Sequence, residues 1–244
     1  MSLRFDHAII LVHDLDLAIA QYRAKGFNAF FGGKHADGKT HNALIVFADG
    51  SYLELLAPTS SELLKGIDLN DRTSFLFLLT QGEGLGGYAL LSDGLEADVE
   101  AMQRLGLGVV LSSPNGRARP DGQQIRWRTA ALDDGTMTPF FIQDQTPRVL
   151  RVPDEPSVTA QPNGVTGVAR LEIGVPELAD GVRDYEMMTG LSVEQGANQA
   201  QFTLNGVEFV IKANTATTVR GQLLDVQLKA SSSETISLNK LMAN

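Results

Sequence analysis

Cysteine is absent from this sequence of 244 residues. A disulfide framework, a thiolate nucleophile and a cysteine-ligated metal site are therefore excluded. No apolar run approaches the length of a membrane span. Basic residues are scattered and the formal net charge is -9, which argues against a nucleic-acid surface. We expect a cytoplasmic protein whose partner is a small-molecule ligand, with neither nucleic acid nor membrane as a partner.

The stretch from Phe5 to Pro58 shows the pattern that the rest of the chain repeats. A strand-like run, His7–Val12, leads to Asp14, a residue type that often caps a helix. Apolar residues then recur at helical spacing, at Leu15, Ala18, Ile19 and Tyr22. A second strand is expected over 28–35, and Asp49-Gly50 between two further strand-like runs predicts a hairpin. The predicted order is β-α-β-β-β.

The same order returns later in the chain, which indicates an internal repeat. A second copy is predicted from a strand at Tyr88–Leu91 and a helical stripe at Leu95, Val99 and Met102. Two later strands of this copy are predicted at Gln124–Leu132 and Met137–Gln143. A third copy starts at Val168, with a helical stripe at Leu178, Val182 and Tyr185 and a hairpin at Asn205-Gly206. The apolar run Ser74–Leu79 predicts an additional strand, and Leu223–Leu228 one more near the end.

The chain resembles the vicinal oxygen chelate superfamily, in particular its glyoxalase-like members, in its repeat, its hairpin and the sequence segments THNALI and DGSYLEL. The resemblance implies an α+β fold in which paired βαβββ modules form a curled sheet around a cavity. We therefore expect a two-module domain over 1–148, a linker over 149–163, and a third, partial module with a C-terminal strand and tail over 164–244. The third module would cover the first domain or form a homodimer.

Strand alternation predicts which side chains face the cavity. With a two-residue turn at Asp49-Gly50, Ile45 pairs with Glu54. His41 and Tyr52 then share the face of Glu54. The resemblance implies that this face is concave, and that His7 and Glu54 occupy the two positions of a module that ligate a divalent metal.

The repeat tests the metal hypothesis. By spacing, His7 corresponds to Gly87 in the second copy and Arg170 in the third, and Glu54 corresponds to Pro139 and Val210. None of these four residues is a metal ligand. Two interpretations stay open. Either His7, His41 and Glu54 hold Fe, Mn, Ni or Zn, or the metal is absent and Glu54 acts as a base oriented by His7 or only forms a polar wall.

Arginines of the second copy are candidates for substrate binding. With a two-residue turn at Asp134-Gly135, Arg126 and Arg128 point into the cavity and Trp127 points out. Two guanidinium groups in a cavity would suit an anionic substrate. A three-residue turn reverses this facing. The loop arginines Arg117 and Arg119 and the loop histidines His13 and His35 are expected to be solvated.

The leading hypothesis is a glyoxalase-like enzyme, a lyase, isomerase or dioxygenase, that acts on a compact anionic or vicinal-oxygen substrate. His7 and Glu54 would bind the metal or move a proton. His41, Tyr52, Arg126 and Arg128 would contact the substrate. The alternative is a metal-free protein that binds and sequesters a small molecule.

Overall fold

The computed structural model describes residues 2–67, 74–133, 139–217, 221–230 and 234–243. The first module consists of β1 (Arg4–Leu11), α1 (Leu15–Ala24), β2 (Phe30–His35), β3 (Thr40–Val46) and β4 (Tyr52–Pro58). Two short helices follow it, α2 (Glu62–Lys65) and α3 (Phe75–Thr80). The second module consists of β5 (Gly84–Leu91), α4 (Leu95–Arg104), β6 (Val109–Leu111), β7 (Asn115–Ala118), β8 (Gln124–Leu132) and β9 (Phe140–Asp144).

The third module follows two short helices, α5 (Arg148–Arg151) and α6 (Pro156–Thr159). It consists of β10 (Val165–Val175), α7 (Leu178–Thr189), β11 (Glu194–Gln195), β12 (Gln199–Leu204) and β13 (Val207–Ala213), followed by β14 (Gln222–Ala230), β15 (Thr235–Ser237) and α8 (Leu238–Met242). The predicted α+β fold of repeated βαβββ modules is confirmed. The division into domains at 148 and 164 stays a prediction. Among the described residues, no helix is long and apolar enough to cross a membrane.

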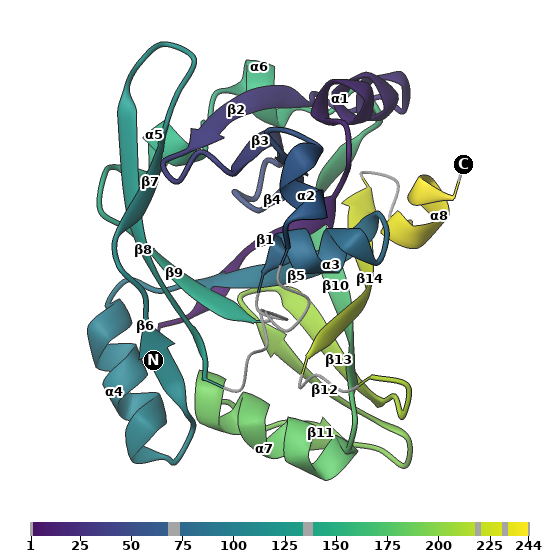
Figure 1. Cartoon of the computed structure of the whole chain (residues 1–244). Coiled ribbons are helices and arrows are strands. Elements are labelled where there is room, and N and C mark those ends of the chain that lie inside the picture. The colour runs from purple at the N-terminus through teal and green to yellow at the C-terminus, as the bar shows by residue number, and fades with distance from the viewer. Residues whose placement is uncertain (1, 68–73, 134–138, 218–220, 231–233, 244) are drawn as a thin grey trace.

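The first two modules form one sheet that closes on itself. Its strand order is β6-β8-β7-β2-β3-β4-β1-β5-β9, and β8 also pairs with β9. The parallel pairing of β1 with β4 is repeated by β5 with β9, as the repeat requires. Figure 1 shows the strands curling around a central space, with α1 and α4 on the outside. The closed sheet is called the barrel below.

Strand β7 completes the barrel by pairing with β2 on one side and β8 on the other. The approach of β7 to β2 depends on Gly33, which has a φ of 144°. A Cβ atom at this position would lie 2.2 Å from the carbonyl oxygen of Ala118. A side chain here would therefore collide with the neighbouring backbone, and only glycine permits this junction.

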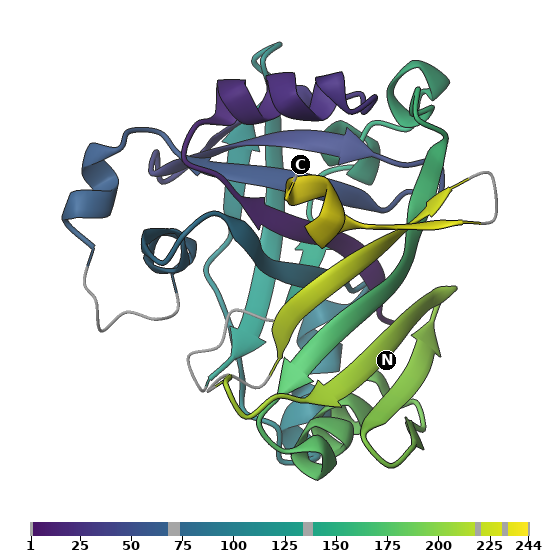
Figure 2. The same cartoon turned by 90° about the vertical axis from the view of Figure 1, so that its right-hand side faces the viewer.

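The third module forms a separate sheet of six strands, in the order β11-β12-β13-β10-β14-β15. Strand β10 pairs in parallel with β13 and antiparallel with β14, which repeats the placement of β1 between β4 and β5. Figure 2 shows this sheet lying against the outside of the barrel. Phe209 of β13 contacts Phe5 and Tyr88 of the barrel, with ring centroids 6.5 and 6.0 Å apart.

One apolar core runs between the barrel and the second sheet. Within it, the hydroxyl groups of Tyr88 and Tyr185 are hydrogen bonded to each other, so two buried polar atoms satisfy one another. The third module therefore packs against the barrel from outside, and none of its described residues lines the cavity.

The sequence interpretation of Ser74–Leu79 as a strand is wrong. Ser74 caps helix α3, since its hydroxyl accepts a hydrogen bond from the backbone N–H of Leu76 at 3.2 Å. Apolar runs this short do not distinguish a strand from a buried helix. Here the N-terminal cap at Ser74 favours the helix. The α3 helix lies near the barrel opening, where Phe75 and Leu76 contribute to the cavity.

Candidate functional site

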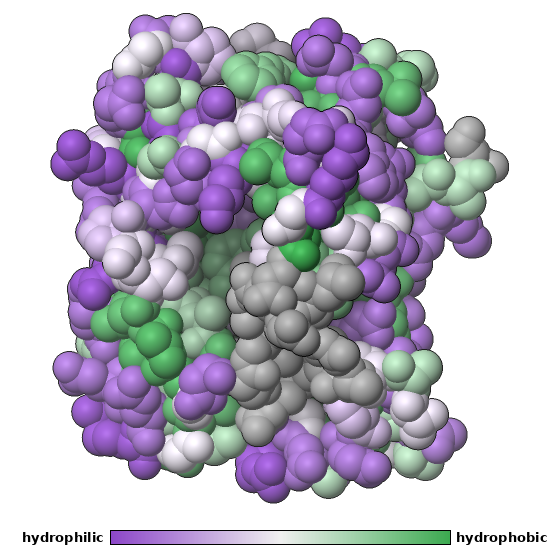
Figure 3. Space-filling view, in the orientation of Figure 1, coloured by the Kyte–Doolittle hydropathy of each residue, from purple (hydrophilic) through white to green (hydrophobic). Residues whose placement is uncertain are grey.

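The barrel encloses a cavity of about 370 Å³, a size that suits a small-molecule ligand. Aromatic and aliphatic side chains make up much of its wall, among them Ile9, Leu44, Trp127, Phe140 and Ile142. The polar and charged residues of the wall include His7, His35, Asn42, Glu54, Arg117 and Arg151. Figure 3 shows the face of the molecule on which the surface is hollowed, with apolar surface inside the recess.

The first hairpin differs from its predicted register. The loop between Phe47 and Ser51 has three residues, with a hydrogen bond from the Phe47 N–H to the Ser51 carbonyl, and Gly50 has a φ of 81°. Leu44 therefore pairs with Glu54, where Ile45 was expected. The one-residue shift turns every side chain of β3 to the opposite face.

His41 consequently lies outside the cavity, and its predicted facing is wrong. It pairs with Ala57, and its ring contacts the exposed Phe31 at a centroid distance of 6.1 Å. Asn42 takes its place on the inner face, 4% exposed, and donates a hydrogen bond of 2.6 Å to Glu54 Oε1. A three-residue loop that ends in a glycine of positive φ is the second common hairpin type, so the same Asp-Gly signal fits both registers.

His7 and Glu54 lie together in the wall, as the sequence analysis predicted. His7 Nε2 is 3.2 Å from Glu54 Oε2, and its other ring nitrogen, Nδ1, is 2.8 Å from Asp6 Oδ2. The contact with Glu54 is an ion pair without the alignment of a hydrogen bond, so the buried Nε2 has no hydrogen-bond partner among the described residues. The imidazole also stacks on Tyr52 at a centroid distance of 4.5 Å.

The two ionisable groups hold each other in their charged forms. Burial lowers the pKa of His7, but the neighbouring carboxylates of Asp6 and Glu54 outweigh it, and the net pKa is raised above 6.5. Burial raises the pKa of Glu54, but His7, His35 and the Asn42 amide outweigh it and lower the pKa to about 2. The resting site is an imidazolium between two carboxylates.

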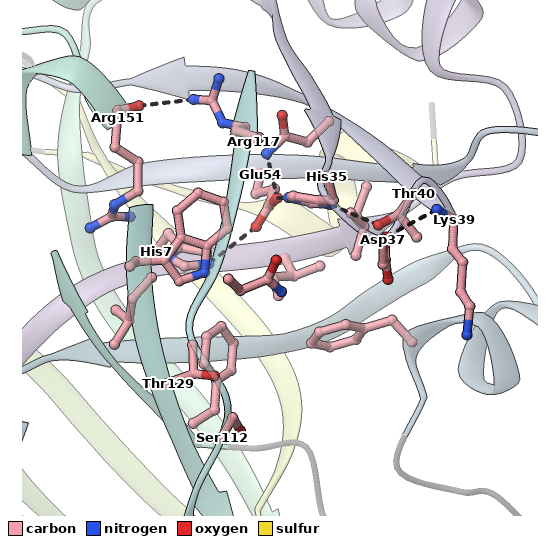
Figure 4. A pocket seen from close by; sticks show the side chains of 18 of the residues that line it. His7, His35, Asp37, Lys39, Thr40, Glu54, Ser112, Arg117, Thr129 and Arg151 are labelled. Carbon is pink, nitrogen blue, oxygen red and sulfur yellow. Dashed lines mark hydrogen bonds and ion pairs between the residues drawn. The ribbon is translucent and has the colours of Figure 1, made fainter. Parts of the chain in front are cut away.

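His35 is a member of the site, although the sequence suggested a solvated loop residue. It lies at the end of β2, its side chain is 14% exposed, and its Nε2 is 3.8 Å from Glu54 Oε1 (Figure 4). Its Nδ1 is 2.7 Å from the Thr40 hydroxyl, and its ring meets Trp127 edge-on at 5.9 Å. Burial lowers the pKa of His35, so this imidazole is neutral near pH 7. His13, in contrast, is exposed beside Glu83.

Arg151 anchors the far side of His7. Its guanidinium donates to Asp6 Oδ2 at 2.8 Å, to both carboxylate oxygens of Asp144 at 2.5 and 2.8 Å, and to the Tyr52 hydroxyl at 2.6 Å. Arg148 also pairs with Asp6. Burial lowers the pKa of Arg151, but these partners outweigh it and the net pKa is raised. Arg151 falls within the segment 149–163 that the sequence suggested was a linker, so the linker completes the cavity wall.

The arginines of β8 do not line the cavity. Arg128 pairs with Gln143 and forms an ion pair with Glu96 of α4, on the outside of the barrel. Trp127 faces inward between them. The predicted facing of Arg126, Trp127 and Arg128 is therefore wrong. The predicted turn at Asp134-Gly135 lies outside the described residues.

The strand pairing extends the comparison of the two modules. Ile9 lies opposite Glu54 in the pairing of β1 with β4. The equal spacing to the helices that begin at Leu15 and Leu95 makes Gly87 the counterpart of His7 and Ala89 the counterpart of Ile9. Ala89 lies opposite Phe140, so Phe140 corresponds to Glu54, one residue from the Pro139 that the spacing suggested. Neither Gly87 nor Phe140 is a metal ligand.

A divalent metal does not fit this set of residues. The second module places Gly87 and Phe140 at the positions that correspond to His7 and Glu54, and neither side chain can ligate a metal. In the described part of the chain, no group of three histidine, aspartate or glutamate side chains is placed to hold a metal ion. We therefore derive no chemical step through a metal.

Comparison with known protein families now adds to the geometry. The model of the glyoxalase-like domain family matches residues 5–189. The chain belongs to this glyoxalase-like family. Its match spans both modules of the barrel and reaches the end of α7 in the third module. No curated protein sequence matches the chain.

The chain is similar to several solved structures, of which the first two below show the same fold. A hypothetical protein from Staphylococcus aureus is 19% identical, with a TM-score of 0.72, over 91% of this chain and 97% of its own. A xylose isomerase-like TIM barrel/4-hydroxyphenylpyruvate dioxygenase fusion protein is 12% identical, with a TM-score of 0.50, over 86% of this chain and 32% of its own. A methylmalonyl-CoA epimerase from Streptomyces coelicolor is 26% identical, with a TM-score of 0.42, over 59% of this chain and 98% of its own.

The sequence analysis missed several polar residues of the wall, among them His35, Asn42, Arg117 and Arg151. The facing of Asn42 follows from the register of the hairpin, which has a three-residue loop. His35 lies on β2, which pairs with β3, so its place follows from that pairing. Arg117 follows from β7, a strand within a stretch that reads as a loop. Alternation across the segment 115–118 would place Arg117 on one face, but only the pairing with β2 shows that this face is inside.

Proposed function

We propose that this glyoxalase-like protein is a small-molecule enzyme that moves a proton within the barrel cavity, as an isomerase or lyase does. The observation that carries the proposal is the buried contact of 3.2 Å between His7 Nε2 and Glu54 Oε2 in the cavity wall. A paired acid and base in a cavity of this size are the groups that proton transfer at carbon requires.

The resting pair is inhibited by its own contact. A carboxylate with a pKa of about 2 is a weak base, and the imidazolium of His7 holds it there. A substrate carbonyl oxygen that accepts the Nε2–H of His7 would draw the imidazolium away from Glu54. Burial would then raise the basicity of Glu54, since desolvation disfavours its charged form. Substrate binding therefore creates the base.

The step follows from these roles. Glu54 takes the proton from the carbon beside the carbonyl; the electron pair of the C–H bond forms a C=C bond, and the π pair of the carbonyl moves to its oxygen. The imidazolium of His7, fixed by Asp6 at 2.8 Å, stabilises the resulting enolate oxygen. In a 2-hydroxy ketone, His7 gives its proton to this oxygen and takes the proton of the neighbouring hydroxyl, and Glu54 returns its proton to the former carbonyl carbon, which completes an isomerisation. Asn42 and His35 hold the carboxylate in position.

A second candidate function is metal-free binding and sequestration of a small molecule. The apolar wall of the second module favours it, because Ala89, Ile142, Trp127 and Phe140 can bury a ligand but cannot react with it. Such a protein would bind ligand without changing it.

Deuterium exchange separates the two functions. A panel of 2-hydroxy ketones and 2-oxo acids is incubated with the protein in D₂O, and loss of the C–H signal next to the carbonyl is followed by proton NMR. We expect catalysed exchange by the wild type and a loss of about 10²–10⁴-fold in Glu54→Gln. Glu83→Gln, at an exposed glutamate outside the cavity, should exchange like the wild type.

Exchange that is equal in the wild type and Glu54→Gln would refute the proton-transfer role of Glu54. Trp127 is the single tryptophan of the sequence and lines the cavity, so its fluorescence reports binding separately. A change in Trp127 emission without any exchange would favour the binding protein.

A further inference from the structure

Arg117 is a buried cation in the cavity wall that the proposed proton transfer does not use. Its side chain is 4% exposed and lies on β7, close to Glu54 and His35 in the close-up view (Figure 4). It donates to two backbone carbonyls, those of Gly32 and, at 3.1 Å, of Arg151. These partners are neutral, and none of the described carboxylates lies within ion-pair distance of Arg117.

Arg151 shows what a structural arginine looks like in the same wall. Its guanidinium contacts the carboxylates of Asp6 and Asp144, and those partners raise its pKa. Burial lowers the pKa of Arg117, and Tyr52 and Glu54, which form no ion pair with it, offset only part of this effect. Two arginines of one wall thus differ in charge compensation, and only Arg117 lacks its counterion.

The nearby carboxylate of Glu54 does not supply the missing charge. Its oxygens face His7 at 3.2 Å and the Asn42 amide at 2.6 Å. A guanidinium has five N–H donors in a planar fork, and the carbonyls of Gly32 and Arg151 use two of them. The remaining donors and the unbalanced charge suit one further oxygen anion, because a buried charge without a partner is costly.

We infer that Arg117 is the anion-binding residue of the cavity and that the ligand is a compact carboxylate with an apolar body. The carboxylate would bind at Arg117 beside the neutral His35. The apolar body would pack against Trp127, Phe140 and Ile142 on the facing wall. This inference rests on the proposed function, since it names the class of compound on which His7 and Glu54 would act.

The test compares each acid with its uncharged amide of the same shape. Three pairs serve as probes: propanoate and propanamide, benzoate and benzamide, and 3-phenylpropanoate and 3-phenylpropanamide. Binding is measured by Trp127 fluorescence and by thermal shift at millimolar concentration. At least one acid should bind the wild type about tenfold or more tightly than its amide, as a charge-assisted hydrogen bond requires.

Variants then assign the preference to a residue. Arg117→Met should abolish the difference between acid and amide, and Arg117→Lys should keep the charge and part of the difference. Arg126→Met is the matched control, because Arg126 is the exposed neighbour of the inward-facing Trp127, and it should bind like the wild type. Lys39→Met tests a further cation of the cavity lining, one that lies apart from the carboxylate partners of Arg151, and should leave the difference largely in place.

Several outcomes would overturn the inference. One is a wild type that binds no acid better than its amide, which needs no variant and so does not depend on whether Arg117→Met folds. Another is a preference for acids that persists in Arg117→Met or Arg117→Lys at full strength, or that disappears in Lys39→Met. The wild type separates the two proposals, because a preference for acids without catalysed C–H exchange would refute proton transfer and leave the role of Arg117 intact.

Discussion

Asp6 and His7 are adjacent in strand β1, yet their side chains are hydrogen bonded at 2.8 Å. Neighbouring residues of a regular strand point to opposite faces of the sheet. The pairing of β1 with β5 skips Asp6, since Phe5 pairs with Leu90 and His7 with Ala89. This β-bulge turns the Asp6 carboxylate toward the imidazole and places it within reach of Arg151.

The bulge makes Asp6 the residue that keeps His7 charged. In Asp6→Asn the pKa of His7 should fall, because the hydrogen-bonded carboxylate that raises it is removed. The free energy of unfolding should drop by about 3–5 kcal/mol, since Arg151 loses a buried partner. Histidine NMR titration and urea unfolding measure the two effects. Asp93→Asn, which breaks the exposed ion pair with Arg4, should cost less than about 1 kcal/mol.

His35 lines the cavity and His41 lies outside it, so variants of these two histidines form a matched pair. His35→Gln removes a buried ring beside Glu54 and should slow C–H exchange by up to about tenfold, the effect of one hydrogen bond. His41→Gln changes a residue on the outer face and should leave exchange within about twofold of the wild type. The reverse order of effects would contradict the register of the first hairpin.

The charged pair of His7 and Glu54 predicts how stability depends on pH. The folded pKa of Glu54 is about 2 against an ordinary value of 4.5, so its contribution is present above pH 4.5 and is lost as the pH falls toward 2. This contribution is about 3 kcal/mol. The folded pKa of His7 is raised above 6.5, so its contribution is complete below pH 6.5 and is lost as the pH rises through the folded pKa.

Urea unfolding of the wild type, Glu54→Gln and His7→Gln between pH 3 and 9 measures both contributions. The difference between the wild type and Glu54→Gln should shrink on the acid side, and the difference for His7→Gln should shrink on the alkaline side. Differences that stay constant with pH would show that the two groups are not held as an ion pair.

Gly50 sets the three-residue loop of the first hairpin. Its φ of 81° is unfavourable for any residue with a Cβ, although no atom lies within 4 Å of where that Cβ would be. Gly50→Ala should therefore lower the free energy of unfolding by about 1–2 kcal/mol through backbone strain alone. Gly66→Ala is the control, because Gly66 has a φ of -105° and equally open surroundings, and it should be neutral within about 0.5 kcal/mol.

Metal content follows from the residues of the second module. Since Gly87 and Phe140 occupy the positions that correspond to His7 and Glu54, protein purified without a histidine tag should carry far less than one divalent ion per chain. Elemental analysis measures this, and EDTA should leave the exchange rate unchanged. A stoichiometric ion that is lost in His7→Ala would refute the prediction and restore the metal hypothesis.

The repeated modules could be predicted from sequence because each depends on local signals. Apolar spacing gave the helices at Leu15, Leu95 and Leu178, and the copies supported each other. The approach of His7 to Glu54 was also predictable, since strand alternation and the family resemblance agree there. These signals depend on residues a few positions apart.

The rest of the site depends on register and on contacts between distant segments. A single extra loop residue shifts the register of β3, so that Asn42 faces the cavity where His41 was expected. An Asp-Gly pair does not determine whether the loop has two or three residues. Arg151 comes from a segment rich in proline and polar residues, and only its pairing with Asp6 and Asp144 draws it into the wall. Such long-range pairing leaves no periodic pattern in the sequence.

The closure of the barrel within one polypeptide explains the unlike walls of its cavity. In a ring assembled from identical single modules, every substitution would appear once per module, and an ionisable group could not be kept on one wall and discarded on the other. Covalent duplication removes that symmetry. One half could retain its imidazole and carboxylate while the other came to present the apolar side chains of Trp127, Phe140 and Ile142.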